Sequence, residues 1–284
     1  MIVATRIPGI TRRSVRKLTK ARGLKPSRKV QLVINAALRG KLTEMAGELE
    51  AMTELILAMP PDKAKREMKL FRAKWSGLFG QQADAIAARW AEAVAEQSRQ
   101  EFRKSVGQAI GMDIAAVLDG GKVREAAVMA ANEASKLIRT IPEDYLNEVE
   151  KAAWVHYQQL PQPEGRTLLE QIQHIGGVSK NRAKLIARDQ TSKIHTAVNQ
   201  ARNEEAGIEE YIWRTARDGR VVGNPAGLYP EVSNKTVHGN HYAREGKKFR
   251  WDRPPEDGHP GTGINCRCIP EPVIDMTNLQ IAFG

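Results

Sequence analysis

The sequence contains few aromatic residues, two cysteines and no long apolar run. Phe, Trp and Tyr together make up 5% of its 284 residues, and the cysteines are Cys266 and Cys268. Two thiols separated by one residue do not form a disulfide framework, so we expect synthesis in a reducing cytoplasm. The longest apolar run, residues 55–59, is far too short to span a bilayer. These absences indicate a soluble, helix-rich protein with a lean core and no membrane contact.

Acidic residues are absent from residues 1–43, which hold twelve Lys or Arg. The remaining 241 residues carry 32 basic and 33 acidic side chains, so the whole excess behind the net charge of +11 lies in this segment. Its arginines also come too early for a signal peptide. A block of one charge sign is typical of an interaction arm, and residues 1–43 are predicted to form one. The candidate nucleic-acid contacts are Arg12, Arg13, Arg16, Lys17, Lys20, Arg22, Lys25, Arg28 and Lys29.

Such an arm neutralises phosphates of double-stranded DNA and gains affinity by counterion release, without reading base sequence. No aromatic residue is interleaved with its basic residues, so base stacking is not expected. Two alternatives stay open, because charge alone does not separate them from DNA binding. In the first alternative the arm docks on an acidic protein surface. In the second it is solvated and has no nucleic-acid role.

Residues 44–165 are predicted to form a helical region. In the first helix, residues 30–59, Met45, Leu49, Met52 and Ile56 recur every three or four positions along one face. Further helices are expected at 62–79, 82–105, 122–139 (ending before Pro142) and 143–159. Methionine and tryptophan stripes at this spacing are interpreted as helix-packing core rather than as a cofactor site.

Residues 166–284 are predicted to form a small α+β domain. A helix over 166–178 should end at Gly176-Gly177, and Ser179 should cap a long helix that Gly207 closes. The segment IGGVSKNRAKLI faintly resembles a helix-hairpin-helix DNA-binding turn, but an ordinary helix start is the preferred interpretation.

After Gly207 the apolar period changes to two, which predicts short antiparallel strands. Strands are expected at 211–215 and 247–251, and Asp218-Gly219 predicts a hairpin turn that returns through residues 220–222. Pro270 and Pro272 should confine residues 269–274 to an edge or irregular strand. The predicted fold class is α+β: a mostly helical N-terminal and middle region, then a C-terminal domain with one long helix and a few short antiparallel strands.

Five sequence segments occur in an order that resembles a known family. They are RAKLIARDQTSK, GIEEYIWRTARDGRV, HYAREGKKF, WDRPP and HPG followed by INCRC. Together they are similar to the phage Mu F-like minor head proteins, also called phage head morphogenesis proteins, over about residues 100–284. The chain departs from the family pattern by an insertion at 223–240 before His241 and by Gln190 in place of a frequent glutamate.

The resemblance implies a minor structural protein of a tailed-phage head rather than an enzyme. Such a protein associates with the portal protein and acts in head assembly and in DNA packaging or ejection. Major head or scaffolding proteins are further expected partners. The expected location is the virion, in the head interior or at the portal vertex, after a period in the host cytoplasm during assembly.

Four residues of zinc-ligand type lie within 28 residues near the C-terminus: His241, His259, Cys266 and Cys268. Structural zinc takes four such ligands, and its binding energy would help to fold a region with few aromatic residues. A structural zinc ion is therefore a hypothesis, and no other cofactor is expected. The alternative is a pair of buried thiols, with His259 and Asn265 hydrogen-bonded to turn backbone.

The same residues also allow enzymatic alternatives. Asp218, His238, His241 and His259 fit the residue types of a metal-dependent nuclease, and a cysteine nucleophile beside His259 is a second option. No paired carboxylates accompany the histidines, so no catalytic residue is assigned. A DNA-binding module outside any virion is the third hypothesis.

Overall fold

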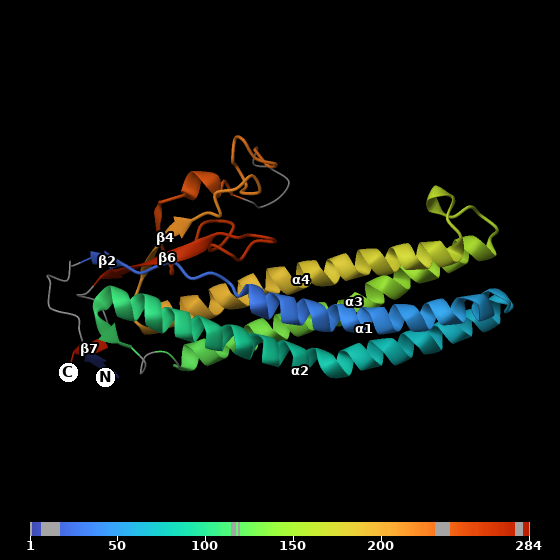
Figure 1. Cartoon of the computed structure of the whole chain (residues 1–284), viewed down its shortest axis with the longest axis horizontal. Coiled ribbons are helices and arrows are strands. Elements are labelled where there is room, and N and C mark those ends of the chain that lie inside the picture. The colour runs from blue at the N-terminus through green and yellow to red at the C-terminus, as the bar shows by residue number, and fades with distance from the viewer. Residues whose placement is uncertain are drawn as a thin grey trace. The chain divides into compact units, whose positions relative to one another are not determined.

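The computed structural model describes residues 2–6, 18–114, 118, 120–230, 239–275 and 281–283. Four helices account for most of them, and none of the helices so described is long and apolar enough to cross a membrane. The fold class is α+β, as predicted. The helices are α1 (Arg28–Leu57), α2 (Pro61–Ile110), α3 (Gly121–Tyr157) and α4 (Leu168–Glu205), with single 3₁₀ turns at Pro163–Gly165 and Tyr242–Arg244 (Figure 1).

The chain divides into two compact units. The first comprises Met1–Arg28, Ala91–Ala130 and Asp189–Gly284, and the second comprises Lys29–Trp90 and Ala131–Arg188. Helices α2, α3 and α4 each contribute residues to both units. The predicted arm boundary after residue 43 falls inside α1, whereas the predicted start of the C-terminal domain at 166 lies two residues before α4.

The second unit is a bundle of α1 with parts of the other three helices. Each helix buries an apolar stripe at intervals of three or four residues, and α1 buries Leu38, Leu42, Met45 and Leu49. Polar contacts join the helices in pairs: Lys74 to Glu48, Arg72 to Glu143, Arg182 to Asp144, and Gln173 to Glu50. Exposed pairs of this kind contribute little to stability, so the buried stripes carry the bundle.

Three of the predicted helix breaks are wrong. Helix α2 continues past residue 80, α3 contains Pro142, and α4 runs through Gly176-Gly177, so Ser179 lies inside a helix and caps nothing. An interior glycine costs only about 1 kcal/mol and an interior proline about 3 kcal/mol. Apolar residues are buried on both sides of each position, and their burial offsets these costs.

The ends of α4 follow standard capping chemistry. The Thr167 hydroxyl accepts the Glu170 amide at 3.2 Å, while the Glu170 carboxylate accepts the Thr167 amide at 2.7 Å, which is a capping box. At the other end Gly207 adopts φ 72°. The amide of Ile208 reaches the Asn203 carbonyl at 2.8 Å, so the helix closes at Gly207 as predicted.

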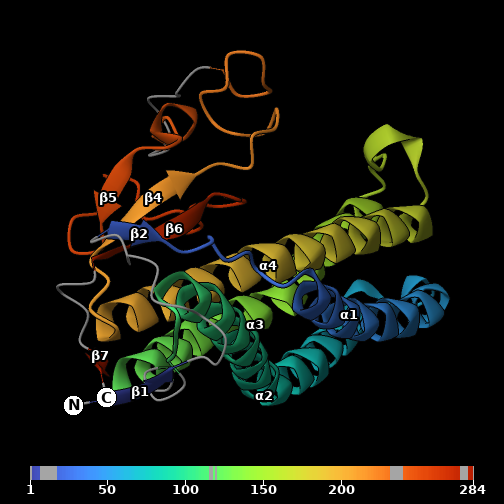
Figure 2. The same cartoon turned by 60° about the vertical axis from the view of Figure 1, so that its left-hand side comes forward.

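The first unit contains two sheets. The larger has the order β2-β6-β4-β5 with every neighbouring pair antiparallel (Figure 2), and the smaller has the order β3-β1-β7. The strands are β1 (Ile2–Arg6), β2 (Leu18–Lys20), β3 (Met112–Asp113), β4 (Glu210–Arg214), β5 (Lys248–Arg250), β6 (Ile269–Asp275) and β7 (Ile281–Phe283).

Strand β6 is a regular internal strand, which corrects the prediction of an edge or irregular strand. The Ala21 amide donates to the Pro272 carbonyl at 3.1 Å, so the backbone of Pro272 faces β2. Pro270 faces the same side, because alternate residues of a strand point alike. Proline has no amide hydrogen, so the two hydrogen bonds that Pro270 and Pro272 cannot donate are missing on the side of the three-residue strand β2. The pairing of Ile269, Glu271 and Val273 with β4 is unaffected.

Asp218-Gly219 does not start a hairpin, because β4 already has a partner on each edge. The Val221 amide instead returns to the Asp218 carbonyl at 3.1 Å, which makes a local turn. The Asp218 carboxylate pairs with Arg267, and this ion pair lowers its pKa. Residues 220–222 therefore belong to a loop and not to a strand.

Two apolar clusters stabilise the first unit. One joins Phe102, Val106 and Ile110 of α2 to Leu24, Ile208 and Ile274. The other gathers Tyr211 and Trp213 of β4 with Trp251 and Cys268. Tyr211 and Trp213 thus share one face of β4, as their spacing predicts, and this second cluster is the floor of the site described next.

Candidate metal centre

His241 is held in a fixed orientation directly before the 3₁₀ turn Tyr242–Arg244. Its side chain is buried, and its ring lies edge-on to Trp213 with 5.0 Å between centroids. Its Nε2 atom lies 2.9 Å from Oδ2 of Asp257. Because a carboxylate accepts hydrogen bonds, this contact places the proton on Nε2 and leaves the lone pair on Nδ1.

Both cysteine sulfurs face that lone pair. The Sγ atoms of Cys266 and Cys268 each lie 3.6 Å from Nδ1 of His241, and all three atoms lie within 4.8 Å of one another. The spacing Cys-x-Cys suits this arrangement, because side chains two residues apart in extended backbone point to the same side. The intervening Arg267 pairs with Asp218 instead.

Asp257 organises the surroundings of His241. Its carboxylate also accepts the Gly239 amide at 2.7 Å and pairs with Arg244 at 2.5 Å. Burial alone would raise the pKa of Asp257, but the hydrogen bonds from Arg244, His241 and Gly239 outweigh burial and lower it. Asp257 therefore stays a carboxylate, and it ties residues 239–244 together.

The electrostatics of the three clustered side chains favour one thiolate. A hydrogen bond from the Cys268 thiol lowers the pKa of Cys266, against the effect of burial, and His241 lowers it further. The same hydrogen bond and burial raise the pKa of Cys268. A thiolate is the form of cysteine that binds metal ions.

His259 is not part of this cluster. Its Nδ1 atom lies 2.9 Å from the Tyr211 hydroxyl, and its ring packs 5.0 Å from that of Trp251. Burial lowers its pKa, so the ring is neutral. Of the four predicted ligands, the structure thus brings together His241, Cys266 and Cys268 and holds His259 against the aromatic floor.

The loop 259–266 docks on polar residues of α4 that the sequence reasoning missed. Thr196 donates to the Pro260 carbonyl at 3.0 Å, Ser192 to the Cys266 carbonyl at 3.3 Å, and Asp189 accepts the Asn265 amide at 2.9 Å. The three α4 residues are buried. Their spacing of three and four positions puts them on one helix face, and that polar stripe was the signal available in the sequence.

The predicted basic arm is described only in part. Arg12, Arg13, Arg16 and Lys17 lie outside the described residues, as does His238 of the nuclease alternative. The other five basic candidates have exposed side chains, and none forms an ion pair within the described part of the chain: Lys20, Arg22, Lys25, Arg28 and Lys29. Lys20 ends strand β2 and Arg28 begins α1, so this part of the segment is ordered backbone.

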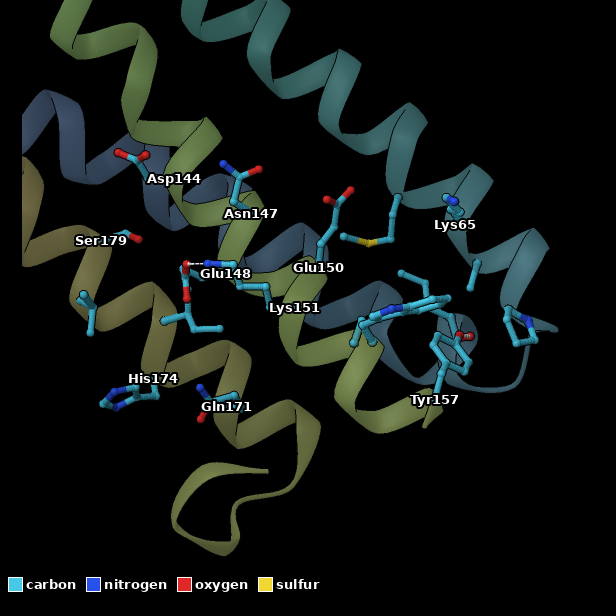
Figure 3. A pocket seen from close by; sticks show the side chains of 18 of the residues that line it. Lys65, Asp144, Asn147, Glu148, Glu150, Lys151, Tyr157, Gln171, His174 and Ser179 are labelled. Carbon is cyan, nitrogen blue, oxygen red and sulfur yellow. Dashed lines mark hydrogen bonds and ion pairs between the residues drawn. The ribbon is translucent and has the colours of Figure 1, made fainter. Parts of the chain in front are cut away.

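A separate pocket of about 1050 Å³ lies within the second unit, between α1, α2, α3 and α4. Figure 3 shows His174 and Gln171 of α4 on one side and Glu148 and Lys151 of α3 beside them. Glu148 and Lys151 pair with each other, and none of the predicted site residues lines this pocket. It therefore has no link to the His-Cys-Cys cluster.

Comparison with known proteins places the chain in a family. Residues 121–270 match the family described as Phage Mu protein F like protein. The chain belongs to this family. The matched residues include all of α3 and α4 together with His241, Asp257, Cys266 and Cys268, so the cluster lies inside the part that defines a Mu F-like protein.

A second comparison found a similar curated protein. The Mu F-like chain is 31% identical over 220 residues to an uncharacterized protein of Haemophilus influenzae. The aligned region covers 77% of this chain and 45% of that relative. The chain thus spans less than half the length of this curated relative. No solved structure matches the chain.

Proposed function

We propose that this Mu F-like chain is a minor structural protein of a tailed-phage head. It associates with the portal protein and acts in head assembly and in DNA packaging or ejection. The family match over residues 121–270 carries this proposal. Major head or scaffolding proteins are the further partners, and the head interior or the portal vertex is the location.

The contacts of the segments that resemble the family support a structural role. Side chains from RAKLIARDQTSK bond to the backbone of the HPG and INCRC segments, as Asp189 does to Asn265 and Ser192 to Cys266. Groups that satisfy buried backbone hydrogen bonds hold a fold together.

The proposal includes a DNA contact through the basic segment. Five exposed cations occur between residues 20 and 29, and none is ion-paired within the described chain. Cations in this state neutralise phosphates without first breaking an existing pair. Binding should therefore be independent of base sequence and weaken steeply with salt.

Replacing the five residues Lys20, Arg22, Lys25, Arg28 and Lys29 by glutamine tests this contact. We expect the slope of log K against log salt for random duplex DNA to fall in magnitude by about 4.5, since each phosphate neutralised contributes about 0.9. A matched variant replaces five exposed cations of α2 by glutamine, namely Lys63, Lys65, Arg66, Lys69 and Lys104. Equal losses in both variants would show that net charge, not this segment, binds DNA.

Quantitative mass spectrometry of purified phage particles tests the main proposal. We expect a few copies of the chain per particle and chemical crosslinks to the portal protein. Particles made without the chain serve as the control for carry-over from the lysate. Absence from washed particles would refute a virion role. Divalent-metal-dependent cleavage of DNA by the purified chain, lost on His241→Ala, would then favour the nuclease alternative.

A further inference from the structure

We propose that His241, Cys266 and Cys268 bind one zinc ion through Nδ1 and the two sulfurs, with the fourth position filled by a nitrogen or oxygen donor outside this triad. The ion would join the loop that begins at Gly239 to the segment that enters β6. This site has three ligands from the cluster and excludes His259, unlike the four-residue set expected from the sequence. It does not depend on the role of the chain in the phage head.

The distances fit a metal ion. A tetrahedral zinc ion lies about 2.3 Å from a thiolate and about 2.0 Å from an imidazole nitrogen, which sets the two donors about 3.5 Å apart. Both separations between sulfur and Nδ1 in the structure are 3.6 Å. Two soft sulfurs and one imidazole also match the ligand types that zinc prefers.

The arrangement of lone pairs within the cluster suits a metal ion. The neutral imidazole has one lone pair, at Nδ1, and Asp257 occupies its other nitrogen at 2.9 Å. Both sulfurs lie at the same distance, 3.6 Å, from that lone pair. An ion placed between the three atoms uses the lone pairs of all of them.

Asp257 supplies the surrounding interaction that zinc-bound histidine usually has. Metal-bound imidazoles commonly donate their other N–H to a carboxylate, which fixes the tautomer and the ring orientation. The Asp257 side chain is only 3% exposed and is itself held by Arg244 and the Gly239 amide. It is therefore a positioning residue and not a ligand.

Metal analysis of the full chain, purified without chelators, tests the ligand set. We expect one zinc ion per chain and X-ray absorption with two sulfur and two nitrogen or oxygen neighbours. Cys266→Ser, Cys268→Ser and His241→Ala should each lose the ion, whereas His259→Ala should keep it. Zinc-free folded protein, even after zinc is supplied, would overturn the proposal, as would equal loss of zinc from His259→Ala.

The role of Asp257 has its own test. Asp257→Asn should weaken zinc affinity about 10-fold to 100-fold, measured by competition with a chelator. Asp252→Asn is the matched control, because Asp252 is exposed and pairs with Arg250 away from the cluster. Removing zinc from the wild-type chain should lower Tm by roughly 10 °C. Unchanged affinity in Asp257→Asn, or an unchanged Tm on zinc removal, would refute a positioned structural ion.

Discussion

Replacing Gly261 by alanine should separate the first unit's loop 259–266 from α4. Gly261 has φ 87°, and a Cβ atom there would lie less than 3.0 Å from Oγ1 of Thr196 and 3.2 Å from Oγ of Ser192. The left-handed conformation costs alanine about 1 kcal/mol. Overpacking costs about 1–3 kcal/mol more, and loss of the Thr196 hydrogen bond to Pro260 about 1 kcal/mol. We expect a total loss of about 3–5 kcal/mol.

Gly246→Ala is the matched control for this change. Gly246 has φ 76°, but its added Cβ atom would meet nothing closer than 3.8 Å. It therefore carries the conformational cost without the steric one, and should destabilise by about 1 kcal/mol. Urea denaturation of both variants, with unchanged m-values, measures the difference.

A double mutant isolates the contact itself. Thr196→Ala removes the nearest obstructing atom, so Gly261→Ala should cost less in that background, with a coupling energy of about 1–2 kcal/mol. Additive effects of the two substitutions would refute the inferred close approach of the loop to α4. A loss in Gly246→Ala as large as that in Gly261→Ala would refute it as well.

Three further changes test other features. Burial, with a smaller contribution from Arg202, lowers the pKa of His195 to about 3, so between pH 6.5 and pH 3 this residue gains its proton only in the unfolded chain. The free energy of unfolding should therefore fall by about 2 kcal/mol from pH 7 to pH 5. His195→Gln should remove this pH dependence, as measured by urea denaturation at each pH. Thr167→Ala should lower the free energy of unfolding by about 1 kcal/mol, because it removes the α4 capping box. Urea denaturation measures this loss, and Thr43→Ala on the exposed surface of α1 is the control. Pro142→Ala should raise Tm, because alanine restores the missing hydrogen bond inside α3; a lower Tm would mean that the packing of the proline ring dominates.

The sequence predicted the elements whose signals are local. The apolar stripe of α1, the glycine that closes α4 and the alternation in β4 all lie within a few residues, and the structure confirms each of them. Prediction from the sequence failed where tertiary packing opposes a local preference. Pro142 and Gly176 disfavour a helix locally, and the burial of side chains on both flanks outweighs that preference.

The candidate site shows the same division between local and distant signals. Residue type alone picked out His241, Cys266 and Cys268, and the structure brings these three together. It could not separate His259 from them, because the partner of His259 is Tyr211, 48 positions away in the chain. Asp257 was missed since nothing near it in the sequence reveals that it faces His241.

The two ends of segment 223–240 are held together on the protein. The Tyr242 amide donates to the Val222 carbonyl at 3.0 Å, so the residues that flank the segment lie next to each other. The Gly239 amide is fixed independently by Asp257 at 2.7 Å. A loop whose ends are joined in this way adds little closure cost as it lengthens. The position of His241 is therefore set by Val222 and Asp257 rather than by the number of residues that precede it.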